Sequence, residues 1–163
     1  MYDNRLLTIA LLLCVLLVSN GVAVAQDDDA EENKALFVKD DTLTIANLVW
    51  EPFEVPGFPL GMKIASVDGD PSLADKPYTF RLAWPDGYKA PPHWHPVTEN
   101  ITILKGGLLF AVGSHFDDSK LKLYTVGDYI AITGKERHYS LAKGDTIVQI
   151  HGIGPFEVFL VEG

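Results

Sequence analysis

Short runs of strand-forming residues, each followed by a turn signal, recur along most of this chain. The runs are rich in Val, Ile, Leu, Phe and Tyr, and Gly, Pro or Asp separates them, as in Pro85-Asp86-Gly87. Strands are predicted over residues 47–51, 61–68, 78–84, 101–105, 108–112, 121–125, 129–133, 140–142, 146–151 and 156–161. Only residues 117–120 favour a helical turn. The pattern predicts an all-β fold, an antiparallel double-sheet jelly-roll β-barrel.

The first 40 residues differ from the rest. Residues 1–25 have the features of a secretory signal: Arg5 gives a basic start, residues 6–18 are largely apolar, and Ala23-Val24-Ala25 fits a cleavage site. A membrane anchor is the alternative, but the apolar run is shorter than the roughly 20 residues that span a bilayer. Residues 26–40 are predicted to be a flexible acidic lead-in and residues 41–163 a single domain. The mature protein is therefore expected to be secreted, and periplasmic in a Gram-negative bacterium.

Charge and cysteine content exclude several classes of function. The net charge is −9, and no basic cluster interrupts the acidic surplus. Such a chain is a poor binder of nucleic acid and of anionic lipid, so neither is expected as a partner of the mature form. The single cysteine, Cys14, lies in the predicted signal and would be removed with it. Cysteine is therefore not expected among metal ligands or nucleophiles.

Two histidines and a carboxylate stand at a spacing that suits a strand. His93 and His95 are two residues apart, and Glu99 follows four residues later. Alternate residues of an extended segment face the same way, so the three side chains are expected to point together. Imidazole and carboxylate are ligands that first-row divalent metals accept. His138, after a later turn, is the expected fourth ligand.

These residues resemble the sequence motifs of the cupin superfamily. The first motif is Gly, five residues, His-x-His, three or four residues, Glu, six residues, Gly, and it is filled from Gly87 to Gly106. The second is kept in part: Gly127 and His138 fit, whereas Thr133, Lys135 and Ala142 occupy positions that hold Pro, Gly and Asn in the family. The resemblance covers about residues 61–161. Within the superfamily, the chain is similar to small single-domain bacterial cupins. This resemblance implies the jelly-roll fold and one divalent metal, Fe, Mn, Ni, Cu or Zn, on His93, His95, Glu99 and His138.

Two readings of function follow from an open site of this kind. The first is a metal-dependent enzyme, of the oxygenase type or related, that acts on a small organic molecule. The alternative is a non-catalytic cupin that binds or senses a metal or small ligand. A metal-free isomerase is a weaker third reading, because the ligand set is complete. The absence of a fused partner domain within the sequence favours the enzyme.

Arg81 and His151 are the expected catalytic residues outside the metal ligands. Arg81 shares a strand face with Thr79 and Ala83, and His151 shares one with Gln149. If these faces line the cavity, the guanidinium would bind an anionic substrate and the imidazole would move a proton. If the faces are reversed, both side chains are in solvent. A homodimer is also expected, with residues 47–51, including Trp50, as the contact.

Overall fold

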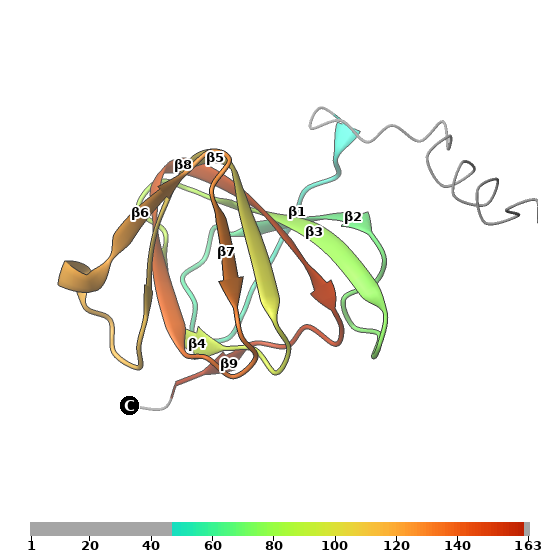
Figure 1. Cartoon of the computed structure of the whole chain (residues 1–163). Helices are drawn as coiled ribbons and strands as arrows, with labels where there is room; N and C mark the ends of the chain where they lie inside the picture. The colour runs from blue at the N-terminus through green and yellow to red at the C-terminus, as the bar shows by residue number, and fades with distance from the viewer. Residues whose placement is uncertain (1–46, 162–163) are drawn as a thin grey trace, which may run out of the picture. The chain divides into compact units, whose positions relative to one another are not determined.

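The computed structural model describes residues 47–161, and nearly all of its regular structure is β-strand (Figure 1). The predicted signal at residues 1–25, with Cys14, and the acidic lead-in at residues 26–40 lie outside the described residues. The strands are β1 (Glu51–Pro52), β2 (Lys63–Asp68), β3 (Pro77–Trp84), β4 (Lys89–Trp94), β5 (Glu99–Val112), β6 (Lys122–Thr125), β7 (Tyr129–Ile132), β8 (His138–Ile153) and β9 (Phe159–Leu160). A 3₁₀ turn, Asp118–Lys120, stands where the sequence favours a helical turn. No helix in the described part is long and apolar enough to cross a membrane.

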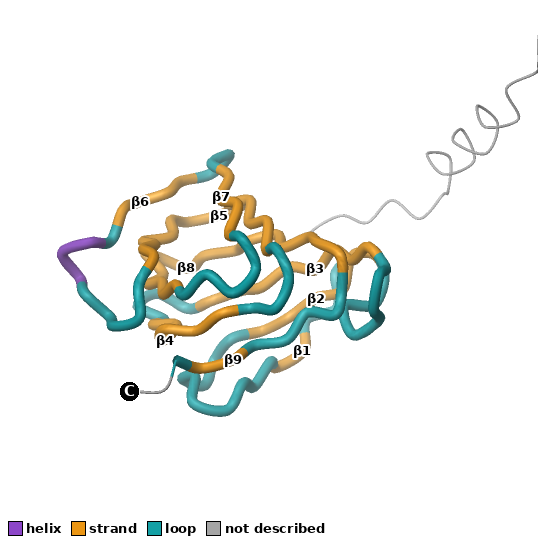
Figure 2. Tube along the Cα trace, turned by 60° about the horizontal axis from the view of Figure 1, so that its bottom comes forward, coloured by secondary structure: helices purple, strands orange, loops and turns teal. Residues whose placement is uncertain are grey.

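Two long strands, β5 and β8, pass through both layers of the fold. They pair with each other from Asn100 opposite His151 to Val112 opposite His138. The first part of β5 also pairs with β7, and the later part of β8 with β3, which continues to β2 and β1. At the other end of the two long strands, β5 pairs with β6 and β8 with β4, which continues to β9. The sheet therefore curls over itself into a jelly roll, as the course of the trace in Figure 2 shows.

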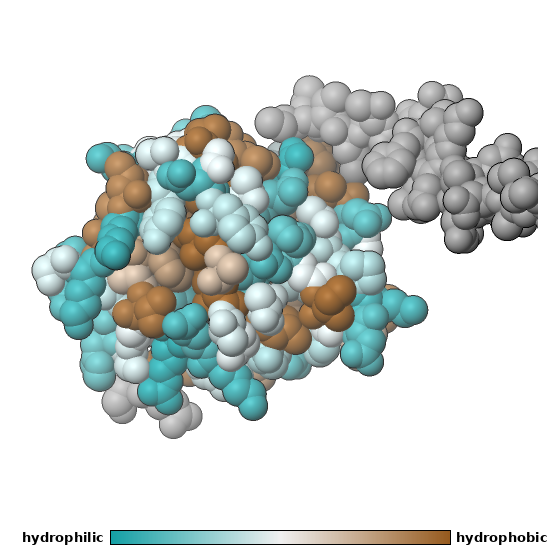
Figure 3. All heavy atoms as spheres, in the orientation of Figure 1, coloured by the Kyte–Doolittle hydropathy of each residue, from teal (hydrophilic) through white to brown (hydrophobic). Residues whose placement is uncertain are grey.

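Alternation along the strands decides which side chains fill the interior. In β3, Tyr78, Phe80, Leu82 and Trp84 are buried, whereas the residues between them are only half-buried. Each fully buried side chain of this size contributes roughly 1.5–3 kcal/mol of hydrophobic stabilisation. The outer face mixes apolar and polar side chains, and Figure 3 shows the apolar ones scattered over the visible face instead of gathered in one patch. The apolar face of β3 is therefore the wall of the interior.

The predicted strands agree with the structure in part: residues 89–94 form β4 although no strand is predicted there, and of residues 47–51 only Glu51 lies in a strand. Residues 101–105 and 108–112 are one continuous strand, β5, because Gly106 has a φ of +70° and lets the chain pass through an irregularity in the pairing with β8. The predicted turn at residues 143–145 likewise lies inside β8. Strand β4 contains Pro91 and Pro92, which donate no hydrogen bond. They are accommodated where the pairing with β8 shifts register between Ala90 and His93.

Candidate metal centre

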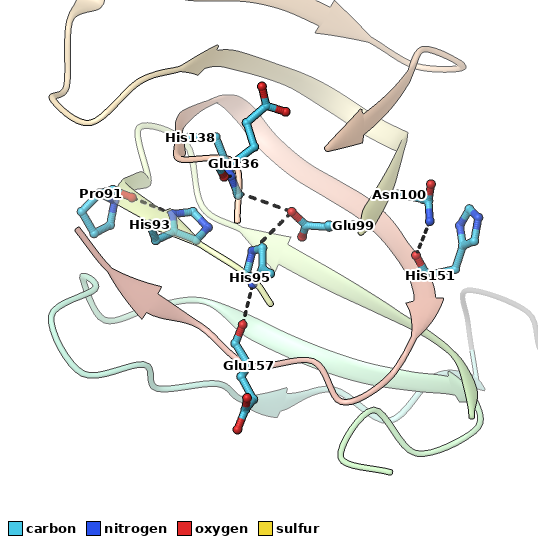
Figure 4. A network of polar contacts seen from close by, with 9 residues as sticks. All are labelled: Pro91, His93, His95, Glu99, Asn100, Glu136, His138, His151 and Glu157. Carbon is cyan, nitrogen blue, oxygen red and sulfur yellow. Dashed lines mark hydrogen bonds and ion pairs between the residues drawn. The ribbon is translucent and has the colours of Figure 1, made fainter. Parts of the chain in front are cut away.

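The four predicted ligands come from three strands that meet inside the barrel. His93 lies in β4 and stands directly opposite His138, the first residue of β8. His95 follows the end of β4, and Glu99 is the first residue of β5. All four side chains are buried. Figure 4 shows them pointing toward one another.

Backbone carbonyls fix the orientation of all three imidazoles. The Nδ1 atoms of His93, His95 and His138 lie 2.7, 2.7 and 3.0 Å from the carbonyl oxygens of Pro91, Glu157 and Glu136, respectively. Because a carbonyl only accepts, each Nδ1 must carry the proton and donate it. In the neutral ring the lone pair is then on Nε2, the arrangement that carbonyl partners impose on metal-binding histidines. One ring nitrogen from each histidine lies within 4.8 Å of the others.

Glu99 completes the cluster on one side. Its Oε2 lies 3.3 Å from Nε2 of His95 and 3.4 Å from Nε2 of His138. Neither Oε2 of Glu99 nor Nε2 of His95 has a hydrogen-bond partner among residues 47–161, and both atoms are inaccessible to solvent. Because each Nδ1 donates its proton to a carbonyl, the lone pairs on the Nε2 atoms and on Oε2 of Glu99 face one another. A divalent cation satisfies such a set, so these residues fit the metal that the sequence motif implies.

The electrostatics of the cluster differ from one ligand to the next. Burial, helped by the neighbouring imidazoles of His138 and His95, lowers the pKa of His93 to about 3. Burial also acts to lower the pKa of His95, but the Glu99 carboxylate outweighs it and the net pKa is raised. For Glu99, burial acts to raise the pKa, and the imidazoles of His95 and His138 overcome it and hold the pKa well below its usual range. The Glu99 carboxylate and the His95 imidazole therefore each favour the charged form of the other.

The cluster opens onto a small apolar cavity of about 30 Å³. Phe156 stacks on His95 with ring centroids 4.4 Å apart, and Phe58 meets His93 edge-on at 5.0 Å. These two rings come from the segments that follow β1 and β8. Besides the four ligands, the lining residues are Phe53, Val55, Phe58, Met62, Leu82, Trp84, Ala90, Ile101, Phe110, Ser140, Phe156 and Val158.

Solved structures with the same arrangement of strands identify the fold. A cupin 2 conserved barrel domain protein from Rhodopseudomonas palustris aligns with a TM-score of 0.55 and 17% identity, over 70% of this chain and 77% of that one. This chain has the cupin fold. The polyketide cyclase RemF from Streptomyces resistomycificus aligns at TM-score 0.61 and 18% identity, over 74% of this chain and 84% of that one. The DMSP lyase DddQ from Ruegeria pomeroyi aligns with a TM-score of 0.56 and 20% identity, over 72% of this chain and 64% of that one.

Comparisons with family models and with curated proteins add no relative. No protein-family model matches the chain, and no curated protein matches it. At identities near 20% the structural likeness concerns the fold, and two of the three relatives are enzymes by name. The chemistry of this chain therefore depends on its own residues.

Arg81 and His151 do not reach the cavity of the cupin barrel. Both are half-buried and lie on the outer face of their strands, where Nε of Arg81 donates to Oε1 of Gln149 over 3.2 Å. Figure 4 shows the His151 ring directed away from the three histidines. The expectation that these two residues face the cavity is therefore wrong, because both side chains lie on the outer face of the barrel. The physical reason is that the apolar face of β3, led by Phe80, forms the wall, which leaves the opposite face for the charged residue.

Several residues of the site were not anticipated from the sequence. Phe156 was assigned to a strand, yet it lies in the connection before β9 and stacks on a ligand. Ser140 lines the cavity two residues after His138. Strand alternation was a sufficient signal for Ser140, since it shares its face with a predicted ligand. No local signal marks Phe156, because its contact depends on how the C-terminal segment crosses the barrel.

Proposed function

We propose that this chain is a metal-dependent enzyme of the cupin fold, of the oxygenase type or related, that acts on a small organic molecule. One observation supports this most: three imidazoles, each held by a carbonyl at Nδ1, bring one ring nitrogen each to within 4.8 Å of the others, and two of them lie against the Glu99 carboxylate. Four protein ligands leave two positions of an octahedral ion free for substrate or oxygen. Iron, manganese, nickel, copper and zinc all accept this ligand set.

When bound, such a metal acts as a Lewis acid or redox centre toward a coordinated oxygen. The chain's own residues would do the rest. His93, His95 and His138 are locked by their carbonyl bonds, so the site is oriented before a ligand arrives. Glu99 lies against two imidazoles, which hold its pKa well below the usual range, so its carboxylate would stay ionised and available to the metal. Phe58 and Phe156 exclude water from the ligands by covering them with apolar surface.

Metal reconstitution tests the proposal. The metal-free protein would be loaded anaerobically with Fe(II), Mn(II), Ni(II), Cu(II) or Zn(II) in turn, and the metal content measured after dialysis. We expect one ion per chain, and loss of most of it in His93→Ala and His95→Ala, because each imidazole supplies a direct bond. His115→Ala is the matched control, since His115 lies exposed in the loop after β5. A double variant, His93→Ala with His95→Ala, that retains stoichiometric metal would overturn the assignment.

Turnover separates the enzyme from the alternative, a cupin that binds or senses a ligand without changing it. The Fe(II)-loaded protein would be screened for oxygen uptake with small oxygen-bearing organic molecules, and His93→Ala would serve as the inactive reference. Uptake that depends on both Fe(II) and the substrate supports the enzyme. Saturable ligand binding with no turnover by any of the five metal forms supports the binding role.

A further inference from the structure

Ser140 is a buried hydroxyl that faces the cavity without a protein partner. The residue is 3% exposed and lines the cavity, two positions along β8 from His138 and on the same face. Its strand neighbours are Ala90 on β4 and Phe110 on β5, neither of which offers a side-chain hydrogen-bonding group. The hydroxyl makes no hydrogen bond within residues 47–161, yet it is not among the atoms that protein completely occludes. The Oγ is therefore turned toward the free volume.

An unpaired hydroxyl in this place is costly unless something binds it. Buried polar groups in native proteins nearly always have a partner, and an alanine would fill the same position without the desolvation penalty. One strand repeat of two residues separates Ser140 from His138, roughly 6.6–6.8 Å along the strand. The hydroxyl is thus placed beside the three-histidine cluster, within the span of a small molecule that also contacts the cluster.

The remainder of the cavity restricts the chemistry of that molecule. Apart from the four proposed ligands, Ser140 and the buried indole N–H of Trp84, the lining side chains are apolar, and no lysine or arginine is among them. Arg81, the expected partner of an anion, is on the outer face and bonds to Gln149. A second charge on the ligand would therefore be desolvated without a partner.

We propose that the Ser140 hydroxyl orients the ligand of this site by a hydrogen bond. The ligand is a small molecule with one oxygen-bearing, metal-binding head and an otherwise uncharged, apolar body. This proposal rests on the proposed function, because it takes the three histidines and Glu99 as a metal site. It adds the specificity-determining residue and the substrate class. The free volume of about 30 Å³ keeps the body short.

The first test measures ligand affinity at a fixed metal content. Each protein would be loaded with Co(II) and titrated with propionohydroxamate, which has a chelating head and an apolar tail, and binding would be followed by the visible absorption of Co(II). We expect Ser140→Ala to bind the probe about tenfold more weakly than the wild type, at unchanged Co(II) content. Ser114→Ala is the control, since the Ser114 hydroxyl bonds to Arg137 outside the cavity.

The direction of the change separates a hydrogen bond from a steric role. Removing the hydroxyl enlarges the cavity, so a residue that only limits space would leave the affinity equal or higher. Equal or tighter binding by Ser140→Ala therefore overturns the proposal, as does loss of Co(II) from that variant, which would make Ser140 part of the metal site.

The second test addresses the ligand class. Succinomonohydroxamate has the same head as propionohydroxamate but ends in a carboxylate. We expect the wild type to bind it at least about tenfold more weakly, because the cavity has no positive side chain to pair with the second charge. Equal or tighter binding contradicts the apolar-ligand class. Failure of the wild type to bind Co(II) at all overturns the proposed function and this inference together, whereas normal Co(II) binding with either adverse result overturns the inference alone.

Discussion

Two glycines at the ends of the first motif provide a matched pair for measuring how tightly the barrel is closed. Gly87 and Gly106 have φ values of +74° and +70°, so alanine at either position pays the same backbone penalty. Their surroundings differ. A methyl group on Gly87 would meet nothing within 4 Å, whereas one on Gly106 would lie 2.5 Å from the carbonyl oxygen of Asp145 and 2.8 Å from Oγ1 of Thr146.

The expected loss of stability follows from these contacts. A left-handed backbone costs a non-glycine residue about 1–2 kcal/mol, and alanine recovers about 0.4–1 kcal/mol by restricting the unfolded chain. Gly87→Ala should therefore lower the free energy of unfolding by about 0–1.6 kcal/mol. Gly106→Ala adds an overpacking cost of about 1–3 kcal/mol against backbone that cannot rotate away. It also disturbs Thr146, whose Oγ1 donates to the carbonyls of Gly107 and Gly144, at a further cost of about 1 kcal/mol.

Urea unfolding followed by tryptophan fluorescence would measure both variants. A chelator would be present so that metal binding does not add stability to the folded state. We expect Gly106→Ala to be less stable than Gly87→Ala by about 2–4 kcal/mol, with similar m-values. Two variants within about 0.5 kcal/mol of each other would refute the reasoning, because the close contact at Gly106 would then carry no energy.

Three other outcomes are expected. Binding of Zn(II) should release a proton wherever the pH lies below the raised pKa of His95, because the Glu99 carboxylate favours the charged imidazole there, while His93, with a pKa of about 3, has none to lose near neutral pH. Affinity should therefore fall as the pH drops below the raised pKa of His95, and calorimetry in buffers of different ionisation enthalpy would count the proton. Light scattering at micromolar concentration should give a dimer that uses residues 47–51, in which Val49 is 74% exposed; a monomeric mass contradicts this. Secreted protein should begin near Gln26 by N-terminal sequencing, and material that still carries Met1 would disprove export with cleavage.

The ligand cluster was predictable because it depends on spacing within short extended segments. His93 and Glu99 are both buried beside the same centre, although a bend at residues 95–98 separates their strands, β4 and β5. His95 lies just beyond β4, yet its side chain keeps the direction of His93 because Nδ1 is bound to the carbonyl of Glu157. That carbonyl is 62 residues away in the sequence, so no local pattern indicates it.

The sequence indicates which residues share a face of a strand, but it does not indicate which of the two faces points inward. Thr79, Arg81 and Ala83 were correctly grouped on one face of β3, but that face is the outer one. The prediction assumed a polar cavity, whereas the walls are built from the aromatic face. Turn signals misled in a related way. Gly106 and Gly144 have the left-handed backbone of turns, yet pairing between β5 and β8 carries both strands through them.

The placement of the ligands also determines when a metal can be acquired. His93 and His138 become neighbours only when β4 pairs with the start of β8, and Glu99 joins them from β5, which is itself held along β8. Such pairings between distant parts of a chain form late and slowly in folding. An unfolded or partly folded chain offers at most the His93–His95 pair. The complete set of ligands exists only after the barrel closes, so the compartment in which this chain folds decides which ions it can choose from.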